Sequence, residues 1–69
     1  MFIVLEIQDD GNGTIGTIVN KKATRDEADS TYHTILAAAS ISNVPIHSAV
    51  MLTSDGGYVC HETHYHNAE

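Results

Sequence analysis

The fold is decided by residues 24–45, which read TRDEADSTYHTILAAASISNVP. Thr24 and Glu27 have the spacing of a capping box, in which the threonine hydroxyl accepts a hydrogen bond from the backbone amide of the glutamate. Apolar or bulky residues then recur on one helical stripe that we expect to face a sheet: Ala28, Tyr32, Ile35, Leu36 and Ala39. Pro45 follows, and the residue before a proline avoids helical angles. The stretch therefore predicts one helix over residues 25–40.

Two patterns typical of strands precede this helix. Residues 2–8 read FIVLEIQ and residues 14–20 read TIGTIVN, and both are rich in β-branched and apolar side chains. Between them lies DDGNG at residues 9–13, a run of turn-forming residues. We therefore expect residues 2–20 to form a hairpin with a loop of about four or five residues.

A second hairpin is predicted after the helix. The residues from Ile46 to Thr53 alternate between the two faces of a strand, and Asp55-Gly56 is a strong signal for a two-residue turn. That turn predicts the cross-strand pairs Leu52 with Val59, Met51 with Cys60, Ile46 with Tyr65 and His47 with His64. The element order is then ββαββ. It predicts a single α+β domain over residues 1–69, in which one helix packs on one face of a four-stranded, mainly antiparallel sheet.

One helix covers only one face of such a sheet, and so the other face must meet water or another molecule. We expect Ile3, Leu5 and Ile7 of the first strand to face the helix. The other expected members of the core face are Ile46, Val50, Leu52, Val59, Tyr65 and His61. The opposite face then carries an apolar set that predicts a homodimer through this face or through a sheet edge: Phe2, Val4, Ile18, Ala49 and Met51.

Potential metal ligands gather on that same outer face: His47, Cys60, Glu62, His64 and His66. Imidazole, carboxylate and thiolate are the ligand types of zinc, nickel and copper sites. Neighbours on one face of a strand are about 6.5–7 Å apart, however, and no two-cysteine or His-Glu-x-x-His motif accompanies them. A solvated polar strand and a small zinc or nickel site therefore both stay open as interpretations. No oxyanion-hole motif accompanies Cys60, and a domain of this size offers little room for a pocket, so we expect no enzymatic activity and no organic cofactor.

The composition limits the partners. Three Lys+Arg against nine Asp+Glu give a formal net charge of −6, which opposes binding to nucleic acid. The one cysteine rules out an internal disulfide, and together with the absence of a leader pattern it predicts a cytoplasmic protein. No apolar run is long enough to predict a membrane span. Protonation of the five histidines would take the charge from −6 to −1, so we expect self-association to rise as the pH falls.

Part of the chain resembles a known group of proteins. The resemblance lies in EAD at residues 27–29, YH at residues 32–33, ILAAAS at residues 35–40 and VPIHSAV at residues 44–50. These segments are similar to those of a family of small Firmicutes and prophage-encoded proteins of unknown function. The resemblance extends over residues 27–51 and implies a bacterial or phage setting. The family has no established activity, and so no functional residue is carried over.

Two functions from different classes follow from these patterns. The first is a non-enzymatic interaction or assembly protein, a homodimer that uses its uncovered sheet face or a sheet edge and is open to a further protein partner. The second is a small metal-binding protein that uses His47, His64 and His66. A chain of 69 residues has a small core, and small domains commonly gain stability from either a partner or a metal. Metal content and oligomeric state separate the two functions.

Overall fold

The helix α1 (Arg25–Ser40) has the bounds that the sequence predicts. Thr24 has extended backbone angles, and its hydroxyl accepts a hydrogen bond from the Glu27 amide at 3.2 Å. At the other end, the backbone amide of Ile41 bonds to the carbonyls of Ala38 and Ala39. The predicted N-terminal cap is therefore present. The acidic residues of the first turn interact favourably with the positive end of the helix dipole.

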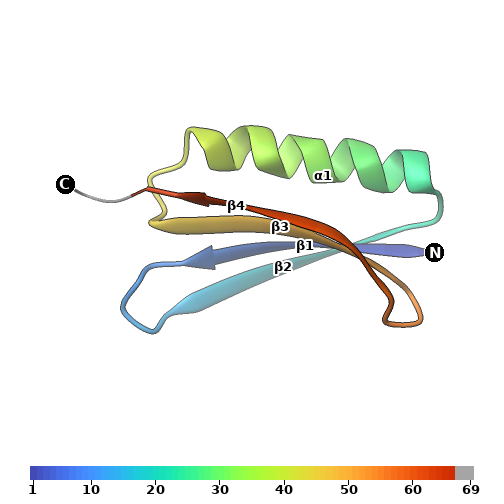
Figure 1. Cartoon of the computed structure of the whole chain (residues 1–69), viewed down its shortest axis with the longest axis horizontal. Helices are drawn as coiled ribbons and strands as arrows, with labels where there is room; N and C mark the ends of the chain where they lie inside the picture. The colour runs from blue at the N-terminus through green and yellow to red at the C-terminus, as the bar shows by residue number, and fades with distance from the viewer. Residues whose placement is uncertain (67–69) are drawn as a thin grey trace.

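The other elements form one sheet in this computed structural model, which describes residues 1–66. They are β1 (Phe2–Asp9), β2 (Ile15–Lys22), β3 (Ile46–Thr53) and β4 (Tyr58–Tyr65). The strand order is β2-β1-β3-β4, and every neighbouring pair is antiparallel. Figure 1 shows α1 lying across one face of the sheet. The predicted ββαββ architecture of the α+β class is thus confirmed.

The second hairpin differs from its predicted register at one end. Met51 pairs with Cys60 as expected, as do the pairs nearer the open end of the hairpin, but Leu52 pairs with Tyr58 and not with Val59. The Thr53 amide bonds to the Gly57 carbonyl at 2.7 Å, so four residues, 54–57, form the loop. A bulge between Met51 and Leu52 absorbs the change in register.

The core lies between α1 and the centre of the sheet. Ala28, Tyr32, Ile35 and Ala39 of the helix are buried against three fully buried residues of the central strands, Val4, Ala49 and Met51. The partly buried residues Phe2, Leu36, Val59 and Cys60 extend this cluster. Alanines on both sides of the contact allow a close approach of helix and sheet.

The face that α1 covers is therefore opposite to the predicted one. Val4, Ala49 and Met51 each have 0% exposure, so the prediction that they form an open interface is wrong. Phe2 packs against the same core, while Ile18 shares this face but lies on the edge strand with 51% exposure. Of the predicted core-face residues, Val59 packs against the core, and the following residues belong to the opposite face instead: Ile3, Leu5, Ile7, Ile46, Val50, Leu52, His61 and Tyr65.

Within residues 1–66, α1 is too short and too polar to cross a membrane.

Candidate interaction surface

The sheet face away from α1 carries eight aliphatic side chains. Residues directly opposite each other in an antiparallel sheet share a face, so the register assigns its members. We call this surface the open face, and it consists of Ile3, Leu5, Ile7, Asp9, Ile15, Thr17, Val19, Lys21, Ile46, Ser48, Val50, Leu52, Tyr58, His61, Thr63 and Tyr65. In Figure 1 no other element lies against this side of the sheet.

Several large side chains of the open face are exposed to solvent. Ile15, Val19, Tyr58 and Tyr65 have exposed fractions of 62%, 54%, 63% and 70%. The central aliphatic residues are half-buried, because their neighbours on adjacent strands cover their sides. A continuous apolar sheet face of this kind is typical of a protein-interaction surface.

Polar groups are carried by half of the sixteen residues of the open face, and two pairs of them bond to each other. The Ser48 hydroxyl donates to the Thr63 hydroxyl at 2.9 Å, and the Tyr58 hydroxyl lies 2.7 Å from Nδ1 of His61. Among the described residues, the charged members of this face are Asp9 at one end of the strands and Lys21 at the other. Ser48, Thr63, Tyr58 and His61 therefore keep a hydrogen-bond partner when the surface is desolvated.

The helix-covered face carries polar residues that were expected on the uncovered face. Nε2 of His47 lies 2.6 Å from Oε2 of Glu6, and the Gln8 amide donates to the same oxygen at 3.1 Å. His47 is 4% exposed, and its Nδ1 has no hydrogen-bond partner within residues 1–66. This network lies beside the hydrophobic core and fixes the His47 ring against β1.

The predicted metal ligands do share one face but do not converge on one point. His47 bonds to Glu6, whereas His64 lies 3.5 Å from Glu62 and stacks on His66 with ring centroids 6.4 Å apart. Nε2 of His66 lies 2.6 Å from the carbonyl oxygen of Ala39, where a ring N–H donates to the end of α1. In the part of the chain that the structure describes, no three ligand side chains are placed to hold an ion. Zinc or nickel binding stays a prediction.

Cys60 lies beside the buried phenol of Tyr32. Burial, with a further contribution from the neighbouring Cys60 thiol, raises the pKa of Tyr32 to about 12. The phenol is therefore neutral at physiological pH and is part of the core. Cys60 is only half-buried and packs against the same cluster, which gives it a packing role.

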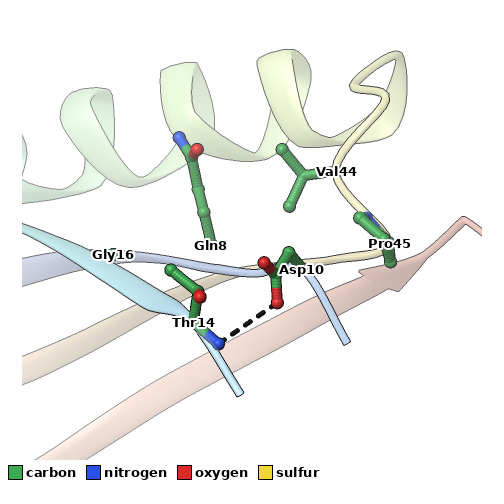
Figure 2. A pocket seen from close by; sticks show the side chains of 6 residues that line it. All are labelled: Gln8, Asp10, Thr14, Gly16, Val44 and Pro45. Atoms are coloured by element: carbon green, nitrogen blue, oxygen red, sulfur yellow. Dashed lines mark hydrogen bonds between the residues drawn. The ribbon is translucent and has the colours of Figure 1, made fainter. Parts of the chain in front are cut away.

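A shallow cleft opens where the first hairpin loop meets the segment between α1 and β3. Its volume is about 290 Å³, and Figure 2 shows its lining residues: Gln8, Asp10, Thr14, Gly16, Val44 and Pro45. The Asp10 carboxylate accepts hydrogen bonds from the backbone amides of Asn12 and Thr14 at 2.7 and 3.2 Å, and these bonds lower the pKa of Asp10. Since this carboxylate already accepts hydrogen bonds within the loop, the cleft offers few polar groups to a ligand.

No protein-family model, curated protein or solved structure matches this chain. The resemblance to Firmicutes and prophage-encoded proteins therefore stays a prediction, and the function is argued from the open face.

Proposed function

We propose that this protein is a non-enzymatic assembly protein that associates with a second copy of itself through the open face. The observation that carries the proposal is the uncovered apolar sheet face, whose aliphatic residues are Ile3, Leu5, Ile7, Ile15, Val19, Ile46, Val50 and Leu52. Burial of apolar surface is the main driving force of protein association.

The size of the open face supports a specific dimer. Four strands of eight residues form it. With about 4.8 Å between strands and about 3.3 Å per residue, each copy presents roughly 500 Å² of projected sheet area. Two copies together reach roughly the 1,000 Å² that a specific interface needs, and accessible area exceeds projected area.

The charge distribution also favours a second copy. The chain carries a formal net charge of −6, so two copies repel each other over most of their surface. Asp9 and Lys21 are the charged residues of the open face within the described chain, and their charges cancel. The open face is therefore the surface through which this acidic chain can meet itself with the least repulsion.

The proposal includes a cytoplasmic setting. The sequence has a single cysteine, as is usual where the surroundings are reducing.

Two neighbouring residues of β2 provide a matched test. Val19 belongs to the open face and is 54% exposed, whereas Ile18 belongs to the other face and is 51% exposed. We expect wild type to show a dimer mass in sedimentation equilibrium in the micromolar range, Val19→Glu to show a monomer mass, and Ile18→Glu to behave as wild type. Both substitutions replace an exposed β-branched residue of the same strand by a carboxylate, so global effects are matched.

Other results would contradict the proposal. A wild-type protein that stays monomeric across the micromolar range would contradict the proposed homodimer. Dissociation by Ile18→Glu but not by Val19→Glu would move the interface away from the open face, to the β2 edge or to the helix-covered side.

A further inference from the structure

The charges of the open face lie at its two ends. Lys21 pairs with Ile3, at the end of the face that also holds Leu52 and Tyr58. Asp9 pairs with Ile15, at the opposite end. Ile3 and Asp9 are six steps apart along β1, which is about 20 Å. Lys21 and Asp9 are therefore too far apart to pair within one chain.

Neither of these side chains has an ion-pair partner within residues 1–66. Lys21 is exposed. Asp9 is half-buried, and its Oδ1 accepts a hydrogen bond from the Gly11 amide at 2.8 Å. The carboxylate has further acceptor capacity for a cation that approaches from the open face.

Two identical sheets that pack face to face are related by a two-fold axis that lies between them. When the strands of the two sheets are aligned, the axis runs either across the strands or along them. An axis across the strands places each end of one open face over the opposite end of the other. An axis along the strands places each end over the equivalent end, with β2 of one copy over β4 of its partner.

We infer that the two copies are related by an axis across the strands, so that Lys21 of each copy pairs with the partner's Asp9. This inference rests on the proposed function and names the orientation of the partner. The arrangement forms two reciprocal ion pairs at the rim of an apolar interface. An axis along the strands would place the Asp9 carboxylate over Ile46 of the partner subunit, away from any cation of that face. A carboxylate desolvated without a partner disfavours association.

Charge reversal tests this orientation. In Lys21→Glu, two acidic groups meet at each rim position, and in Asp9→Lys two basic groups meet there. We expect each single variant to raise the dimer dissociation constant about tenfold or more, because two attractions become two repulsions. An equimolar mixture of Lys21→Glu with Asp9→Lys should restore the dimer mass in sedimentation, and so should the double variant Lys21→Glu/Asp9→Lys. High salt should weaken these effects, since it screens charges at a rim.

Matched controls separate this effect from the change in net charge. Lys22→Glu changes the charge by the same amount at the next position of β2 but on the helix-covered face, because Lys22 pairs with Phe2. Glu62→Lys is the control for Asp9→Lys. It changes the charge by the same amount but on the helix-covered face, because Glu62 pairs with the buried Ala49. Both controls should dimerise as wild type does. Asp9→Asn keeps an acceptor for the Gly11 amide and serves if Asp9→Lys loosens the loop. It should raise the dissociation constant less than Asp9→Lys does.

The outcomes distinguish the orientation from the proposed function. A wild-type protein that is monomeric throughout removes both. A wild-type dimer that tolerates Lys21→Glu and Asp9→Lys, or single-variant losses that neither the mixture nor the double variant restores, would overturn the orientation and leave the dimer through the open face standing.

Discussion

Met51 and Leu52 are neighbours in the chain but lie on opposite faces of β3. Met51 is fully buried under α1, whereas Leu52 is half-buried on the open face. The two residues therefore report on different parts of the molecule. Met51 contributes to the core of a single chain, and on the proposed function Leu52 contributes mainly to the contact between two chains.

Truncation of these two residues should separate folding from association. In the monomeric Val19→Glu background, we expect Met51→Ala to lower the free energy of unfolding by about 2–5 kcal/mol, because it leaves a cavity in the core. Met51→Leu should lower it by less than about 1.5 kcal/mol, because the volume is similar. Leu52→Ala should have a smaller effect than Met51→Ala. Urea denaturation measures all three, and an equal loss for Leu52→Ala would contradict the assignment of the covered face.

At the level of the helix, the Thr24 cap is a local feature that needs no tertiary contact. We expect Thr24→Ala to lower the free energy of unfolding by about 1 kcal/mol, because the Glu27 amide loses its acceptor. Thr34→Ala is the matched control in the middle of α1, where the side chain is exposed. It should be neutral or slightly stabilising, since alanine has the higher helix propensity. Equal losses in chemical denaturation would show that the cap contributes nothing specific.

The elements themselves could be predicted from sequence because their signals are local. The bounds of α1 follow from the Thr24 cap and from Pro45, and the pairing of Met51 with Cys60 follows from the position of the second turn. Leu52 pairs with Tyr58 and not with Val59, and this change of partner could not be predicted from the Asp55-Gly56 turn. Gly56 has a positive φ of 93°, but Asp55 does not, because the loop is longer than a two-residue turn.

The choice of the covered face could not be predicted from the alternation of residues. A period of two shows which residues share a face, but it does not show which face the helix covers. The predicted covered set of β1 is Ile3, Leu5 and Ile7. The structure instead covers the set with Val4, Ala49 and Met51. The size of the side chains indicates the covered face better, because an alanine-rich helix packs closely on a strand that also carries a small residue such as Ala49.

The single helix of this fold also determines what a pair of chains would look like in cross-section. With α1 on one side of each sheet, two copies joined through their open faces form a four-layer stack in the order helix, sheet, sheet, helix. The largest apolar layer of that stack would lie between the chains and not within either of them. Pairing would then add to the stability of each folded chain, so the fraction of folded protein would depend on the protein concentration.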